Sequence, residues 1–140
     1  MGQLAEFISN HPWLITGLVV SWLAVMTYEL RLKSQSLTHV SVNDAVRLIN
    51  NKGALVIDVR EPEAYAAGHI VNSRNIPLKQ LMSGEDVVKK QKNKVLLTVC
   101  DRGTISGKAA IALRKAGYQS TFSLKGGLAG WRAENLPLVK

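Results

Sequence analysis

A long uncharged stretch near the start of the chain limits what this sequence can fold into. No Asp, Glu, Lys or Arg occurs between Phe7 and Tyr28, and residues 12–28 hold only three Ser or Thr side chains. A buried core helix of this length normally carries a polar stripe, and this stretch carries none. Because Trp13 and Tyr28 lie at its ends, as in aromatic belts, we expect a single membrane-spanning helix over about residues 8–29.

We expect this span to belong to an uncleaved anchor, residues 1–30. Before the span Glu6 is the only charged side chain, and no A-x-A-like cleavage site follows it, which argues against a signal peptide. Arg31 and Lys33 follow the span, and the positive-inside rule then places the carboxyl-terminal bulk in the cytoplasm. The polar residues 31–37 are expected to form a linker. The sequence leaves open whether the span also pairs with another membrane protein.

The remaining residues, 38–140, alternate between strand-like and helix-like segments. Continuous apolar runs predict strands buried on both faces at residues 54–59 and 95–100, and residues 120–124, "STFSL", are expected to form a third strand. The expected helices occupy residues 41–53, 61–68, 106–117 and two short pieces that begin at 77 and after 126. This alternation predicts an α/β domain with an open parallel sheet and helices on both faces.

The excess of basic residues does not indicate a nucleic-acid partner. The formal net charge is +8, from 18 Lys and Arg against 10 Asp and Glu, but the basic residues are dispersed. One short cluster, Lys89, Lys90, Lys92 and Lys94, has no aromatic residues interleaved with it. We therefore expect the positive charge to attract an anionic membrane surface or a small anionic substrate.

Cys100, the only cysteine, lies where a buried strand is expected to end. Ligands of open α/β sheets bind beyond the carboxyl ends of the strands. A helix is expected to begin about six residues later, so the backbone N–H groups of the loop "CDRGTI" and the helix N-terminus can face an anion. Gly103 permits a tight loop, and Arg102 adds a cation. This setting favours a thiolate nucleophile, whereas the alternative is a cysteine that only packs against the next helix.

We expect neither a metal nor a cofactor. The three His and one Cys show no metal-ligand spacing, and His11 and His39 belong to no recognisable motif. A lone cysteine cannot form an internal disulfide, so a reducing compartment suits it.

Two further stretches resemble a known family. Residues 58–78, "DVREPEAYAAGHIVNSRNIPL", are similar to the first signature of the rhodanese-like domain family, and residues 124–131, "LKGGLAGW", resemble its closing signature. Cys100 lies between them, where that family has its active-site cysteine. The resemblance covers residues 37–138. The anchored layout is similar to single-domain bacterial rhodanese-like proteins of the inner membrane.

The resemblance implies a sulfurtransferase. The Cys100 thiolate attacks the outer sulfur of a donor such as thiosulfate, a persulfide forms, and its sulfur passes to cyanide or a thiol acceptor. The donor and the persulfide are expected to bind the backbone of the loop residues Asp101, Arg102, Gly103, Thr104 and Ile105. Because the chain has no second cysteine, the transfer ends on an external acceptor.

The resemblance also implies supporting residues. Asp58 and Arg60 are expected to brace loops by ion pairing, and His69 to make a structural hydrogen bond rather than act as a general base. Ser106 follows the loop, where phosphatases and arsenate reductases with a Cys-x5-Arg loop need an arginine to grip an oxyanion. We therefore set that chemistry aside.

The loop departs from the family at two positions. Asp101 and Ile105 stand where many active members carry Arg or Lys. Asp101 is expected to disfavour the thiolate and to repel thiosulfate, and Arg102 is expected to offset its charge. The Ile105 side chain offers an anionic donor molecule no hydrogen bond, whereas Arg or Lys at this position would. The natural donor is then expected to be a protein persulfide or a low-molecular-weight persulfide rather than thiosulfate. The alternative function is a non-catalytic, membrane-tethered interaction module.

Overall fold

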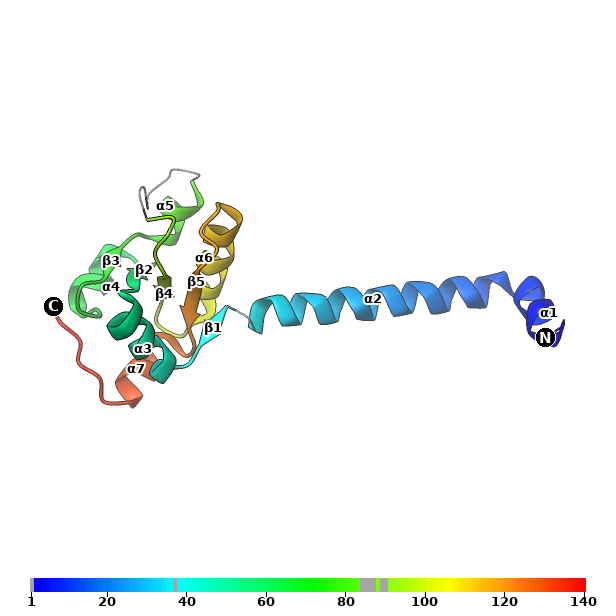
Figure 1. The fold of residues 1–140 in the computed structure, drawn as a ribbon, viewed down its shortest axis with the longest axis horizontal. Helices are drawn as coiled ribbons and strands as arrows, with labels where there is room; N and C mark the ends of the chain where they lie inside the picture. The colour runs from blue at the N-terminus through cyan, green and yellow to red at the C-terminus, as the bar shows by residue number, and fades with distance from the viewer. Residues whose placement is uncertain (1, 37, 84–87, 89–90) are drawn as a thin grey trace. The chain divides into compact units, whose positions relative to one another are not determined.

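The structure is a computed structural model that describes residues 2–36, 38–83, 88 and 91–140. The chain divides into two compact units, Met1–Leu37 and Thr38–Lys140. Figure 1 shows that the first unit, as far as it is described, is made of two helices, and that the second is built around a sheet.

The first unit consists of helices α1 (Gly2–Asn10) and α2 (Pro12–Ser36). Proline suits the first turn of α2, where its missing N–H leaves no helical bond unmade. Within α2, residues Pro12–Leu32 have a mean hydropathy of 1.5 and none of them is buried, so this helix is long and apolar enough to cross a membrane. The α2 helix also continues to Ser36, through most of the stretch 31–37 that its polar composition predicted to be a linker.

The hydroxyl groups of the two threonines of α2 donate hydrogen bonds to backbone carbonyls of the same helix. Thr16 Oγ1 donates to Pro12 O at 2.9 Å, and Thr27 Oγ1 donates to Ala24 O at 2.9 Å. A hydroxyl group without a partner is costly in hydrocarbon. These bonds keep the outer surface of α2 compatible with lipid.

The second unit contains the predicted parallel sheet. Its strand order is β1-β5-β4-β2-β3, and every neighbouring pair is parallel. The strands are β1 (His39–Val40), β2 (Leu55–Asp58), β3 (Arg74–Asn75), β4 (Leu96–Val99) and β5 (Thr121–Leu124). The three predicted strands form the adjacent strands β2, β4 and β5. The outer strands β1 and β3 were not predicted, because two residues are too short to show a hydrophobic pattern.

Helices cover both faces of this sheet. They are α3 (Val42–Lys52), α4 (Pro62–Ala67), α5 (Leu78–Met82), α6 (Thr104–Lys115) and α7 (Gly127–Ala133). Adjacent residues of β4 enter different core clusters: Leu96 packs with residues of α5 and α6, and Leu97 packs with residues of α3 and α7. The prediction of helices on both faces is therefore confirmed, and it places the end of β4 between two packed layers (Figure 1).

Candidate active site

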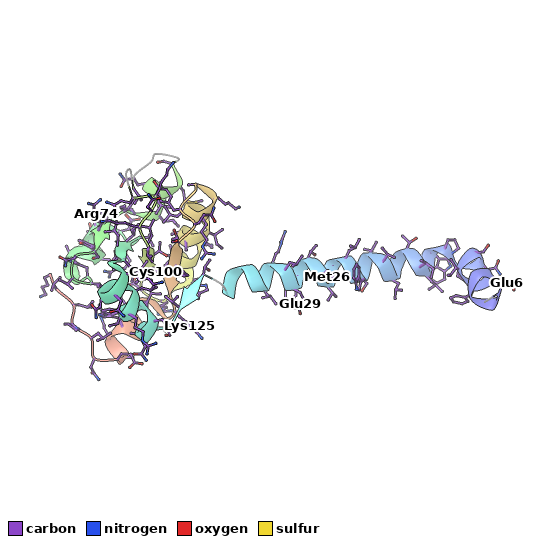
Figure 2. The ribbon with its side chains drawn as sticks, viewed as in Figure 1. Glu6, Met26, Glu29, Arg74, Cys100 and Lys125 are labelled. Atoms are coloured by element: carbon purple, nitrogen blue, oxygen red, sulfur yellow. The ribbon has the colours of Figure 1, made fainter. Side chains whose placement is uncertain are left out.

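A pocket of about 620 Å³ lies at the carboxyl ends of β2 and β4. This is the edge at which ligands of open α/β sheets bind. Six residues predicted for the site line it: Arg60, Cys100, Asp101, Arg102, Thr104 and Ile105. Figure 2 shows Cys100 among the side chains of the second unit.

The sulfur of Cys100 is enclosed by hydrogen-bond donors. The residue is 3% exposed. The backbone N–H of Gly103 donates to Cys100 Sγ at 3.0 Å, and that of Ser106 donates at 3.4 Å. Such donors favour a negatively charged sulfur over a neutral one, as does the positive end of the α6 dipole.

The helix after Cys100 starts earlier than predicted. We expected α6 from about residue 106, whereas it begins at Thr104. Gly103 is the N-cap and adopts a left-handed conformation with φ 92°. The periodicity of apolar residues does not indicate a helix start of this kind. Because of this early start, Ser106 lies in the first turn, where backbone N–H groups lack helical partners and can point at the sulfur.

A buried pair of hydroxyl groups lies behind the sulfur. Ser106 Oγ is 3.4 Å from Cys100 Sγ, donates to Gly103 O at 3.1 Å, and lies 2.9 Å from Ser123 Oγ. Both serines have no exposed surface. Sequence reasoning placed Ser106 at the site but missed Ser123. The available signal was the second serine of the predicted strand 120–124, "STFSL", whose hydroxyl needs a hydrogen-bond partner once the strand is buried.

The start of α7 holds the loop that carries Cys100. Leu128 N–H donates to Cys100 O at 2.8 Å, and Ala129 N–H donates to Asp101 O at 3.0 Å. This contact needs glycine at position 127, where φ is 58° and an added Cβ would lie 2.7 Å from the backbone nitrogen of Arg102. The closing segment "LKGGLAGW" therefore acts directly on the loop.

Asp58 and Arg60 form a buried ion pair at the edge of the pocket. Arg60 Nη2 lies 2.7 Å from Asp58 Oδ2, and Arg60 Nε donates to both carboxylate oxygens of Asp58. Arg60 Nη2 also donates to Gly68 O at 2.7 Å. Burial works to lower the pKa of Arg60, but the hydrogen bond to Asp58 and the charges of Asp58 and Asp101 outweigh it, so the pKa is raised above its usual value.

Arg60, rather than Arg102, is the partner of Asp101. Arg60 Nη1 lies 3.3 Å from Asp101 Oδ1, and no ion pair of Arg102 is formed among the described residues. The expectation that Arg102 offsets the charge of Asp101 therefore needs correction. The arginine two residues beyond β2 does so, because the neighbouring strands β2 and β4 bring their carboxyl ends together.

His69 lies apart from the sulfur. Its Nδ1 is 3.0 Å from Tyr65 O, and its ring stacks on that of Tyr65 with centroids 3.8 Å apart. Its backbone pairs with Val139. The contacts of His69 suit the structural role expected of it, which stays a prediction.

Two predictions concern groups of side chains outside the pocket. Among the residues that the structure describes, no group of three or more His, Cys, Asp or Glu is arranged to hold a metal ion. Within the short basic cluster, Lys92 and Lys94 are exposed, and Lys89 and Lys90 lie outside the described residues.

Comparison with known proteins identifies the family. The profile of the family described as "Rhodanese-like domain" matches residues 41–134, which include the whole sheet from β2 to β5. The chain belongs to the rhodanese-like domain family. The match begins three residues after Thr38, where the second compact unit starts.

Relatives and solved structures agree with this assignment. Over 145 residues the chain is 34% identical to the uncharacterized protein YibN of Escherichia coli K12, and the alignment covers 100% of this chain and 99% of that protein. The thiosulfate sulfurtransferase GlpE of Pseudoalteromonas translucida is 28% identical over 95 residues, covering 68% of this chain and 89% of that protein.

Two solved structures share the fold. A rhodanese-related protein of Thermoplasma volcanium superimposes with a TM-score of 0.63 at 31% identity, covering 72% of this chain and 96% of that one. The human single-domain sulfurtransferase TSTD1 gives a TM-score of 0.60 at 26% identity, covering 69% of this chain and 96% of that one.

Proposed function

We propose that this rhodanese-like protein is a membrane-anchored sulfurtransferase that carries sulfane sulfur on Cys100. The observation that carries the proposal is the set of donors around Cys100 Sγ: the N–H groups of Gly103 and Ser106 point at a sulfur that lines an open pocket. Hydrogen bonds to the charged form stabilise a thiolate, which is the reactive form of cysteine. A cysteine with only a packing role has no need of such donors or of a pocket.

The proposed reaction has two steps. The thiolate of Cys100 attacks the outer sulfur of a donor, the sulfur–sulfur bond of the donor breaks, and the leaving group departs with the electron pair. An external acceptor, such as a thiol or cyanide, then attacks the outer sulfur of the Cys100 persulfide and regenerates the thiolate. The loop from Asp101 to Ile105 holds the donor, and Asp58, Arg60, His69 and Ser106 support it.

Intact mass spectrometry tests this proposal. The full-length protein in detergent is incubated with thiosulfate and, separately, with an organic persulfide. We expect a gain of one sulfur atom on Cys100, lost again on addition of cyanide, and no gain in the Cys100→Ser variant. If folded protein with a free thiol gains no sulfur from either donor, the proposal is wrong.

That negative result would favour the alternative of a non-catalytic interaction module tethered to the membrane. The feature in favour of the module is Asp101, a carboxylate beside the nucleophile. Arg60 offsets part of this negative charge, although it is also paired with Asp58, so the charge argument against catalysis is weakened. The sulfurtransferase therefore remains the proposal.

We also propose that α2 anchors the protein in the bacterial inner membrane as a single span, with residues 38–140 as the catalytic domain on the cytoplasmic side. The length and hydropathy of α2 support the span, and Arg31 and Lys33 at its carboxyl end support the orientation. The cytoplasm also provides low-molecular-weight thiols as acceptors and keeps a lone cysteine reduced.

A further inference from the structure

The pocket beside Cys100 extends well beyond the sulfur atom. Its volume of about 620 Å³ falls within the range of sites for organic small molecules, roughly 300–1,000 Å³. A small inorganic anion such as thiosulfate fills only a minor part of that space. The lining of the remaining space therefore indicates what else binds there.

Apolar side chains form much of this lining. Ile105 of α6 is 48% exposed although it is a large aliphatic residue, and it lines the pocket. Leu128 and Ala129 of α7 add further apolar surface. A surface of this kind binds the carbon skeleton of an organic molecule, whereas a fully hydrated anion gains nothing from it.

Two unpaired arginines lie at the same pocket. Arg102 of the loop and Arg132 in the last turn of α7 both line it, and both are exposed. Neither takes part in an ion pair among the described residues. The third arginine of the pocket, Arg60, is occupied by Asp58, Gly68 and Asp101. The guanidinium groups available to a ligand are therefore those of Arg102 and Arg132.

We propose that the donor is a low-molecular-weight organic persulfide that carries carboxylates, of the kind formed by a cysteine-containing peptide. This inference rests on the proposed sulfurtransferase function. Arg102 and Arg132 bind the carboxylates, for which the planar guanidinium is well shaped. Ile105, Leu128 and Ala129 cover the carbon skeleton, and the sulfur end faces Cys100.

The transfer from such a donor balances without any further reagent. The Cys100 thiolate attacks the outer sulfur of R–S–SH, and a new sulfur–sulfur bond forms at Cys100 Sγ. The original sulfur–sulfur bond breaks, and the thiolate R–S⁻ leaves with the electron pair. The proton stays on the transferred sulfur, so the products are the Cys100 persulfide and a free organic thiolate. The arginines also bind this anionic product.

The test compares an anionic organic donor with a neutral one. Full-length protein in detergent is loaded from glutathione persulfide, from hydroxyethyl persulfide, which has no carboxylate, or from thiosulfate, and persulfide on Cys100 is followed by mass spectrometry. In the Arg132→Gln variant the glutathione persulfide concentration for half-maximal loading should rise about tenfold, as expected for one charge-assisted hydrogen bond. With hydroxyethyl persulfide the change should stay below about twofold.

A matched control removes one positive charge elsewhere. Arg74 of β3 is exposed and does not line the pocket (Figure 2), so Arg74→Gln should leave loading from all three donors unchanged. If Arg132→Gln weakens loading from both organic persulfides equally, the inference is wrong while the sulfurtransferase function stands. If none of the three donors loads the wild-type protein, the proposed function itself is wrong.

Discussion

At the scale of single residues, Ser123 is the finding with the clearest chemical consequence. Its hydroxyl lies 2.9 Å from that of Ser106, which in turn lies 3.4 Å from Cys100 Sγ. Ser106 Oγ donates to Gly103 O and accepts from the Cys100 thiol; once that thiol has lost its proton, the hydroxyl proton of Ser106 can turn to the sulfur. A hydrogen bond donated by Ser123 makes Ser106 a better donor, because bonds in a chain polarise one another. We therefore regard Ser123 as a positioning residue for the thiolate.

Replacing Ser123 by alanine should lower the rate at which iodoacetamide alkylates Cys100 by about 2–5-fold, in line with the loss of part of one buried hydrogen bond. The exposed Ser120, one residue before β5, is the matched control, and Ser120→Ala should react at the wild-type rate. A wild-type alkylation rate in Ser123→Ala, with a reduced rate in Ser106→Ala, would remove Ser123 from the site.

Arg60 is the residue whose loss should cost most stability. In Arg60→Met the carboxylate of Asp58, which is 1% exposed, stays buried without its partner, and we expect the free energy of unfolding to fall by about 3–5 kcal/mol. Urea unfolding followed by circular dichroism measures the change. Arg47→Met is the control, since the exposed pair of Arg47 and Asp44, 4.0 Å apart, is worth less than about 1 kcal/mol. Equal losses in the two variants would contradict this account.

Sequence reasoning located the centre of the site but not its surroundings. Cys100 and its loop follow from a buried apolar run that ends in a glycine-containing segment. Arg132 and Leu128, which line the pocket, and Ser123, which lies behind the sulfur, were missed as site residues, because they come from segments beyond α6 in the sequence. Their proximity depends on the strand order, in which β5 lies beside β4, and no periodicity in the sequence reveals that order.

At the scale of whole elements, the first turn of α7 has a role that the sequence did not predict: it holds the loop that carries Cys100. Its N–H groups, which a helix leaves free, bind the carbonyl groups of Cys100 and Asp101. The short last helix therefore acts as a clamp on the loop that carries Cys100. The clamp depends on the absence of a side chain at Gly127, whose Cα lies against the backbone of residues 100–102.

Replacing Gly127 by alanine should lower the free energy of unfolding by at least about 2 kcal/mol, because a clash with the loop backbone adds to the strain of a left-handed alanine. Gly53 offers a matched control, since its φ is also 58° but nothing lies within 4 Å of an added Cβ. Gly53→Ala should cost about 1 kcal/mol, and thermal unfolding of the two variants measures the difference. Similar costs would show that the loop moves aside freely.

The elements themselves were largely predictable. Ser41 caps α3 by accepting from the N–H of Asp44 at 3.2 Å, and Gly53 ends the helix in a left-handed conformation. The apolar runs became β2 and β4, because strands buried on both faces need continuous hydrophobicity, and the segment 120–124 became β5. The start of α6 was placed too late, since the residues 104–106 show no apolar periodicity and a glycine conformation determines where the helix begins.

At the scale of the whole molecule, α2 and the rhodanese-like unit support different parts of the proposal. The composition of α2 supports a location at the membrane, and the fold of Thr38–Lys140 supports the proposed chemistry. The sequence alone suggested this division, because an uncharged stretch ends before the first strand–helix alternation begins. The assignment of residues 1–30 as anchor, 31–37 as linker and 38–140 as the rhodanese-like domain stays a prediction.

Reporter fusions test the proposed orientation. Green fluorescent protein joined after Lys140 should fluoresce, and alkaline phosphatase at the same place should stay inactive, because the carboxyl end is expected in the cytoplasm. Replacing both Arg31 and Lys33 by Gln should raise the phosphatase activity, since the charge bias at the end of the span is then lost. An active phosphatase fusion to the wild-type chain would reverse the assigned orientation.

The position of β4 in the sheet has a consequence for how the domain unfolds. The strand that ends just before Cys100 is paired on both edges, to β5 and β2, and all four of its residues are buried. Its amide protons can exchange with solvent only when the domain as a whole opens. The backbone beside the reactive sulfur should therefore be the slowest-exchanging part of the chain. Heat or denaturant should then disrupt the Cys100 pocket together with the fold, and a partly opened domain with an intact pocket is not expected to exist.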